Sequence, residues 1–148
     1  VLADQRGVEV QQISSGKNRG FANVMKVAVQ TDTARRTAAG TIFGNRFPRV
    51  IQLDGYPMEL KPEGHVVVML NEDRPGVIGQ YGGAFGRHNV NIADMTVSRK
   101  KRLATAMVGI NIDETPSDEA MKEVRELQFV KEAWYIHLPE LPFEQQGE

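Results

Sequence analysis

The order of apolar patterns between residues 65 and 112 most constrains what this chain can fold into. The run His65–Leu70 (HVVVML) is continuously apolar, which is typical of a strand buried on both faces. A loop follows it, and then apolar residues recur at helical spacing. Two further segments, Asn91–Arg99 and Leu103–Ile112, have strand patterns, and the second alternates apolar residues on one face. A strand, a helix and two more strands are therefore expected in that order.

A second helix and a last strand complete this pattern. Thr115, Pro116 and Asp118 have the character of an N-cap, a first helical residue and a capping-box acid. The helix has an apolar stripe of Met121, Val124 and Leu127. The segment Val130–Leu138 again alternates as a strand does. The resulting order β-α-β-β-α-β predicts a ferredoxin-like arrangement.

The first part of the chain is rich in strand patterns instead. Segments 23–31, 37–43, 49–53 and 56–60 each favour a strand, and Asp54-Gly55 is a typical hairpin turn. We therefore predict an α+β protein in three parts. Residues 1–62 form a strand-rich, partial α+β domain, residues 63–139 form the ferredoxin-like domain, and residues 140–148 form a tail.

Composition excludes several classes of function. The net charge of -1 argues against a general nucleic-acid or membrane-surface binder, which usually carries a basic excess. No apolar run approaches the roughly 20 residues that a membrane span needs. The absence of cysteine removes disulfides and thiol chemistry, and it fits a cytoplasmic protein. Because the chain begins with Val1 in what resembles the end of a helix, we expect a fragment of a longer protein.

The segment Asn71–Ile78 is the strongest local signal for a binding site. Pro75 suits a first helical position, and a helix start offers unpaired N–H groups and a partial positive charge to an anion. Asp73 lies just before this start and could hold an ammonium group. A free α-amino acid carries both charges, so it fits such a site. The alternative is that Asp73 merely caps the helix. The amides expected to take part are those of Gly76, Val77 and Ile78.

The same helix contains four glycines, which are poor helix formers. Their presence predicts close packing of the helix backbone against a sheet or a partner. They do not form a dinucleotide-binding fingerprint, because no GxGxxG follows a strand and opens a helix. No Ser-His-Asp, metal-ligand or paired-carboxylate spacing stands out either. We therefore expect neither a catalytic site nor a cofactor in this chain. The glycines are Gly79, Gly82, Gly83 and Gly86.

Three stretches of the sequence resemble one family. NEDRPGVIGQYGGAFGRHNVNIADMTVSRK (71–100) is very similar to the ACT domain of D-3-phosphoglycerate dehydrogenases. GTIFGNRFPRVIQLDGYPMEL (40–60) and LADQRGVEV (2–10) resemble the intervening domain of the longer forms. The resemblance implies an allosteric regulatory region of an oxidoreductase of L-serine biosynthesis. It also implies NAD for catalytic domains of about 300 further residues, which we do not expect in this chain.

The resemblance further implies a ligand and its contacts. In this family L-serine binds between the ACT domains of two subunits, so a homo-oligomer, at least a dimer, is expected. Asn71 matches a residue that contacts the ligand, Asp73 matches an Asn or Asp that contacts its amino group, and Asn91 matches an Asn supplied by the partner. Well-known members have His or Tyr in place of Asn71, which leaves the identity of the amino acid open.

A second site is implied in the first part of the chain. The intervening domain of the long forms binds an anion through basic residues, and Arg49 and Lys61 fall at matching positions, with Arg46 close by. The alternative is that these basic residues simply flank a hairpin and are solvated. The basic run Arg99–Arg102 could likewise hold an acidic partner, although a charged turn is commoner.

The sequence is also compatible with other functions. One is the regulatory part of an iron–sulfur L-serine dehydratase, although the run DRPGVIG favours the dehydrogenase. Another is a free-standing ACT module that only dimerises. RNA binding, which the ferredoxin-like fold also serves, is disfavoured because the middle strands lack base-stacking aromatics. The expected partners are a free amino acid and a second copy of the chain, with no nucleic acid and no membrane.

Overall fold

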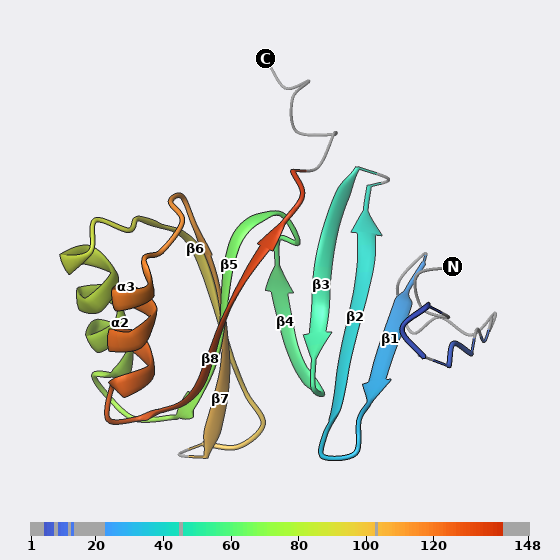
Figure 1. The fold of residues 1–148 in the computed structure, drawn as a ribbon, viewed down its shortest axis with the longest axis horizontal. Helices are drawn as coiled ribbons and strands as arrows, with labels where there is room; N and C mark the ends of the chain where they lie inside the picture. The colour runs from blue at the N-terminus through green and yellow to red at the C-terminus, as the bar shows by residue number, and fades with distance from the viewer. Residues whose placement is uncertain are drawn as a thin grey trace.

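The computed structural model describes residues 5–7, 9–11, 13, 23–44, 46–102 and 104–140. Their strands form two antiparallel four-stranded sheets, with the orders β1-β2-β3-β4 and β6-β7-β5-β8. Figure 1 shows both helices, α2 and α3, on one side of the second sheet and the first sheet on its other side. The predicted α+β class is confirmed. The predicted tail lies outside the described residues, apart from Glu140.

The first sheet is a meander of four consecutive strands. Its third and last hairpin turns at Asp54 and Gly55, which have φ angles of 46° and 78°. Positive φ at both positions is what a two-residue type I′ turn requires, so the predicted hairpin is confirmed. The side chain of Asp54 also accepts a hydrogen bond from Thr37 N at 2.7 Å. The strands are β1 (Met25–Gln30), β2 (Arg35–Phe43), β3 (Phe47–Leu53) and β4 (Tyr56–Leu60).

The second sheet has the predicted βαββαβ order. Its first strand lies between its third and its fourth, as in the ferredoxin-like arrangement. All three pairings are antiparallel, and β6 and β8 are the two edge strands. The elements are β5 (Gly64–Glu72), α2 (Val77–Arg87), β6 (Ile92–Arg99), β7 (Thr105–Ile112), α3 (Asp118–Glu126) and β8 (Val130–Leu138).

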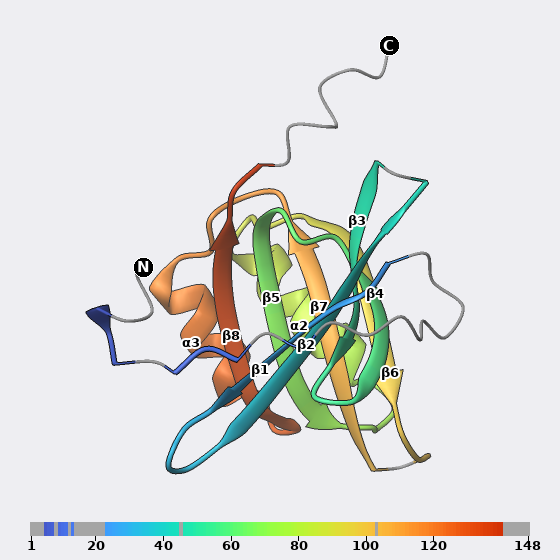
Figure 2. The same cartoon turned by 90° about the vertical axis from the view of Figure 1, so that its right-hand side faces the viewer.

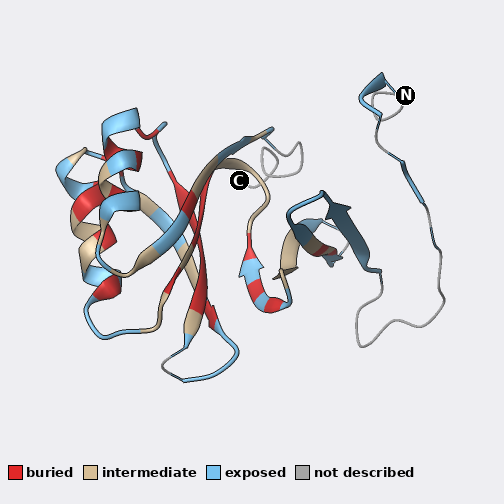
Figure 3. Cartoon of the chain, turned by 60° about the horizontal axis from the view of Figure 1, so that its bottom comes forward, coloured by how far each residue is buried: buried red, intermediate tan, exposed pale blue. Residues whose placement is uncertain are grey.

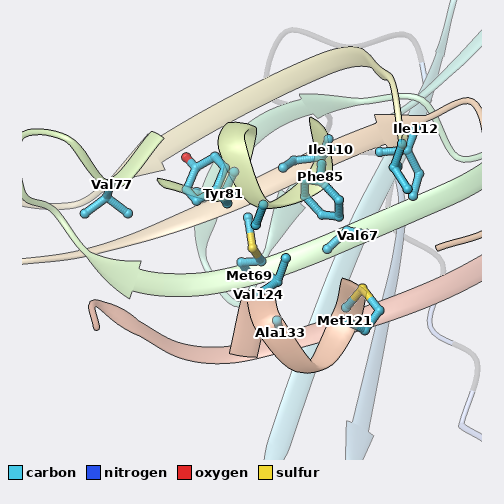
Figure 4. Packing of buried hydrophobic residues seen from close by; sticks show 13 residues of the cluster. Val67, Met69, Val77, Tyr81, Phe85, Ile110, Ile112, Met121, Val124 and Ala133 are labelled. Carbon is cyan, nitrogen blue, oxygen red and sulfur yellow. The ribbon is translucent and has the colours of Figure 1, made fainter. Parts of the chain in front are cut away.

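The main core lies between this sheet and its two helices. Val67 and Met69 of β5 point toward the helices, and Tyr81 and Phe85 of α2 and Val124 of α3 pack onto them. Figure 4 shows these side chains in one layer. Each is at most 1% exposed. The alternation predicted for β7 is confirmed here, since Val108, Ile110 and Ile112 all belong to this core.

A smaller core covers the opposite face of the second sheet. Tyr56, Met58 and Leu60 of β4 pack there against Val66 and Val68 of β5. Strand β5 is therefore covered on both faces, which explains why its sequence is continuously apolar instead of alternating. Figure 3 shows the resulting concentration of buried residues on β4 and the second sheet, in contrast to the exposed β1. The predicted domain boundary after residue 62 stays a prediction.

The starts of both helices differ from the predicted ones. In α3 the N-cap is Ser117, whose hydroxyl accepts a hydrogen bond from Ala120 N at 3.1 Å, so the assignment of Thr115 as the cap is wrong. In α2 the N-cap is Gly76, and Pro75 lies before the helix. Val77 N approaches Arg74 O at 3.4 Å, and Gly76 has a φ of 86°. Pro75 and Gly76 therefore form the middle of a type II turn, which favours Pro followed by Gly.

The glycines of α2 do not mark a close contact with the sheet. A Cβ atom added at Gly79, Gly82 or Gly86 would meet nothing within 4 Å. At Gly83 the nearest atom, at 3.4 Å, belongs to the flexible side chain of Arg87. The prediction of close packing against the sheet is therefore wrong. Neither α2 nor α3, the helices bounded within the described residues, has the length and apolar character that crossing a membrane requires.

Candidate ligand-binding site

The loop between β5 and α2 forms one end of the second sheet. Its backbone is fixed to neighbouring segments, because Asp73 N donates to Ala104 O at 2.8 Å and Glu72 N donates to Phe129 O at 2.9 Å. The N-cap of α2 is a glycine, which has no side chain to cap the helix, and the first turn contains no acidic residue. The N-terminal amides and the positive end of the helix dipole therefore face this loop. No acidic side chain in the first turn of the helix neutralises them.

Asp73 lies beside this helix start and forms an ion pair. One carboxylate oxygen, Oδ2, is 2.8 Å from Nη1 of Arg99, the last residue of β6. The N-cap of α2 is Gly76, so Asp73 is not the cap residue. Arg99 was not among the predicted site residues. The only sequence signal for it was the basic run 99–102, which is equally typical of a charged turn.

Asn71 lies beneath the loop and is almost fully buried. Side chains two residues apart in a strand lie on the same face, and Asn71 comes two residues after Met69 and four after Val67 in β5. Its side chain is therefore on the helix side of the sheet, where Asn71 pairs with Ala106 of β7. Only 3% of the residue is exposed. Its Nδ2 donates to Glu72 O at 2.7 Å, whereas Oδ1 has no hydrogen-bond partner among the described residues.

Asn91 lies at the opposite end of β6 from Arg99. The strand has eight residues, which corresponds to about 25 Å at roughly 3.3 Å per residue. Asn91 N donates to Glu114 Oε2 at 2.7 Å, and its Nδ2 donates to Asp113 Oδ2 at 2.6 Å. One chain therefore brings together Asn71, Asp73 and the start of α2, but it does not bring Asn91 to them.

The residues of the predicted anion site each have a separate local contact. The guanidinium carbon of Arg46 is 5.9 Å from the centroid of the Phe47 ring. Arg49 Nη1 donates to the neighbouring Pro48 O at 2.8 Å, and its Nε is 4.0 Å from Glu59 Oε1. Lys61 Nζ lies 3.6 Å from Glu63 Oε1.

The surroundings of Lys61 are acidic overall. A cavity of about 490 Å³ lies beside it, and its lining includes four carboxylates. An acidic lining disfavours an anion, so the anion site remains a prediction that the geometry does not support. The carboxylates do not form a metal site either, since no group of three or more His, Cys, Asp or Glu in the described part of the chain could hold an ion. The four are Glu63, Asp94, Asp113 and Glu140.

A larger cavity lies between the two sheets. Its volume is about 510 Å³, and its lining is almost entirely apolar, with Val27, Leu60, Val68 and Trp134 among its walls. Arg36 stands at this cavity with its guanidinium carbon 4.8 Å from the centre of the Trp134 ring. The cavity is far less polar than the β5–α2 loop, and it contains none of the predicted site residues.

Comparisons with known proteins divide the chain into the same two parts. Residues 65–129 match the ACT domain, and residues 1–54 match the D-3-phosphoglycerate dehydrogenase intervening domain. The D-3-phosphoglycerate dehydrogenase of Archaeoglobus fulgidus is 32% identical over 139 residues. Those of Methanocaldococcus jannaschii and Bacillus subtilis are each 28% identical over 138 residues.

The alignments cover nearly all of this chain but only a small part of each relative. Each of the three alignments covers 93% of this chain but only 26% of the relative, so the chain spans about a quarter of the length of the relatives that it matches. The first match contains β1, β2 and β3 and the second extends from β5 to α3, whereas β4 and β8 lie outside both matches. By its two matched domains, the chain belongs with the intervening-domain and ACT regions of the D-3-phosphoglycerate dehydrogenases.

Proposed function

We propose that this chain binds a free α-amino acid, L-serine, at the start of α2 and that binding regulates a D-3-phosphoglycerate dehydrogenase. The observation that carries the proposal is the pairing of opposite charges in one loop. The carboxylate of Asp73 lies three residues before the N-cap of a helix whose first turn has no acidic residue. An amino acid presents an ammonium and a carboxylate on one carbon, so it complements both groups at once.

Each group of the loop has a role in this proposal. The carboxylate of Asp73 accepts hydrogen bonds from the ligand ammonium. Arg99, paired with Oδ2 of Asp73, fixes the orientation of that carboxylate. The amide of Val77 exchanges its long contact with Arg74 O, 3.4 Å, for the ligand carboxylate and binds it together with the amide of Ile78, where the helix dipole also favours negative charge. Asn71 forms the floor of the site from the end of β5.

A second copy of the chain completes the site. Strand β6 is an edge strand that pairs with β7 alone among the described residues. Antiparallel pairing of two β6 strands about a two-fold axis places the start of one beside the end of the other. Asn91 of the partner subunit then approaches Asp73 and Arg99, and it holds the ligand carboxylate together with the helix amides. Serine bridges the two subunits and favours one arrangement of them, which is how binding biases a distant active site.

The charges at the two ends of β6 support this pairing. Acidic residues surround its start, where Asp94, Asp113 and Glu114 lie, and the basic run Arg99–Arg102 follows its end. In an antiparallel pair of β6 strands the acidic end of each strand lies beside the basic end of the other. Electrostatic attraction therefore favours this pairing of two identical chains. The same arrangement brings the ligand-contacting residues of the two copies together.

The test is a calorimetric titration of the full chain with L-serine, with glycine and 3-phosphoglycerate as comparisons. We expect saturable serine binding and a shift of the chain toward dimer in sedimentation. Asp73→Ala removes the carboxylate that holds the ammonium and should weaken binding, whereas Asp32→Ala, in the exposed β1–β2 turn, should not change it. Serine binding that Asp73→Ala leaves unchanged contradicts the site. A dimer that binds none of the three compounds favours a free-standing assembly module.

A further inference from the structure

Two buried polar atoms near the start of α2 have no partner among the described residues. They are Oδ1 of Asn71 and the hydroxyl oxygen of Tyr81. The two residues are 3% and 1% exposed. An unsatisfied buried polar atom costs about 1–3 kcal/mol, so such atoms are rare in native structures and each needs an explanation.

Both side chains lie in the same layer of the structure. Asn71 is on the helix side of β5, at the end where the strand enters the β5–α2 loop. Tyr81 belongs to the core beneath α2, one helical turn after Val77. Helical side chains lean toward the N-terminus of their helix, and Figure 4 shows the Tyr81 hydroxyl on the side of the ring that faces Val77. The two unpartnered atoms therefore lie toward the same end of the core, under the first turn of α2.

We propose that Tyr81 and Asn71 form the inner polar wall of the amino-acid site and select a ligand whose side chain carries a hydroxyl group. This inference rests on the function proposed above, and it adds Tyr81 as a residue that determines specificity. The two atoms have complementary needs. Oδ1 of Asn71 is an acceptor without a donor, whereas the Tyr81 hydroxyl is a donor without an acceptor.

A single ligand hydroxyl satisfies both atoms, because it donates one hydrogen bond and accepts another. Burial raises the pKa of Tyr81 to about 12, so its hydroxyl keeps its proton and remains a donor at neutral pH. A side chain without the hydroxyl leaves both buried groups unpaired. Sites built to bind a substrate hydroxyl reject the analogue that lacks it much more strongly than apolar pockets distinguish one methylene.

The discriminating ligands are L-serine and L-alanine, which differ only in the hydroxyl group. In calorimetric titrations of the unmodified chain we expect serine to bind at least about tenfold more tightly than alanine. Tyr81→Phe keeps the ring and removes the hydroxyl. It should weaken serine binding and leave alanine binding unchanged, so that the ratio of the two affinities falls toward one.

Thermal unfolding without ligand provides a second measurement. Tyr81→Phe removes an unsatisfied buried group, so its Tm should be equal to or higher than that of the unmodified chain. The matched control is Tyr56→Phe, since the Tyr56 hydroxyl has a partner, Thr105 Oγ1, at 2.8 Å. The control should lower the Tm and preserve the ratio of serine to alanine affinity.

The outcomes separate this inference from the proposed function. If neither amino acid binds the unmodified chain, the proposed function fails and this inference fails with it. If both bind equally well, or if Tyr81→Phe leaves their ratio unchanged, the amino-acid site stands and the selective role of Tyr81 is wrong. A marked fall in the Tm of Tyr81→Phe shows that the hydroxyl has a structural partner, which also overturns the inference.

Discussion

The ammonium group of Lys100 lies over the ring of Tyr56, 4.2 Å from its centroid. The same Nζ donates a hydrogen bond to Asp54 O at 3.0 Å. Lys100 follows Arg99 directly, and Arg99 is the partner of Asp73. Consecutive residues at the end of β6 therefore contact the candidate site and the first sheet, whose strands cross in front of the second sheet in Figure 2. This pair of residues therefore links the candidate site to the first sheet.

Removing the Lys100 contact should weaken the attachment of the first sheet. Lys100→Gln loses the cation–π interaction, which is worth about 0.5–1 kcal/mol at an exposed position. We expect a decrease of that size in the free energy of unfolding, measured by urea denaturation. The control is Lys101→Gln, the exposed neighbour in the same turn, which should leave it unchanged. Equal decreases in both variants would mean that the contact with Tyr56 adds nothing specific.

Pairing of two chains through β6 should depend on salt. The proposed dimer brings acidic and basic ends together at the surface, and such interactions are screened as the ionic strength rises. We expect the dimer dissociation constant from sedimentation to increase between about 0.05 M and about 0.5 M NaCl. Lys101→Glu should weaken the dimer further, whereas Lys122→Glu on α3 should not. If neither salt nor Lys101→Glu changes the dimer dissociation constant, the interface does not lie along β6.

Two glycines at the start of α2 should respond in opposite directions to substitution by alanine. Gly79 has open space around the position of an added Cβ, so Gly79→Ala should stabilise the chain by about 1 kcal/mol through helix propensity. Gly76 has a φ of 86°, so Gly76→Ala should destabilise it by about 1–2 kcal/mol. Thermal or urea unfolding of both variants measures the difference. A destabilising Gly79→Ala would indicate that a partner chain packs closely on this face of α2.

The ion pair between the two helices should make stability sensitive to acid. The pKa of Glu123 is held below its ordinary value, first by the hydrogen bonds from Arg87 and then by His88, whose Nε2 lies 2.8 Å away. A lowered pKa in the folded state means that the carboxylate stabilises the fold above its unfolded pKa, near 4.5. This contribution is lost as the pH falls through the lower folded value.

Glu123→Gln should therefore reduce the loss of stability on acidification. The measurement is the free energy of unfolding as a function of pH from neutral to acidic conditions. The control is Glu126→Gln on the same helix, whose partner Lys122 is 3.9 Å away and more exposed. If Glu123→Gln and the unmodified chain lose stability in parallel, another carboxylate causes the acid response.

Patterns along the sequence determined most of the fold of the second part. The continuous apolar run of β5, the alternation of β7 and the apolar stripe of α3 each record the surface that the element buries, because the period of the side chains follows the local backbone. The hairpin at Asp54-Gly55 was equally local, since two positive φ angles restrict the residues that can occupy it. The start of α2 was not determined by the local sequence, because Pro75 fits both a first helical turn and the type II turn that the structure contains.

Tertiary structure alone decided how the candidate site is assembled. The sequence singled out Asp73, but its partner Arg99 is 26 residues away and is brought to it only by the return of β6 beside the β5–α2 loop. The same is true of the hydroxyl of Tyr81, which periodicity identifies as a core position without showing that its polar atom lacks a partner. Local patterns specify which face of an element is buried. They do not specify which side chains meet, because such contacts depend on the packing of elements that are distant in the sequence.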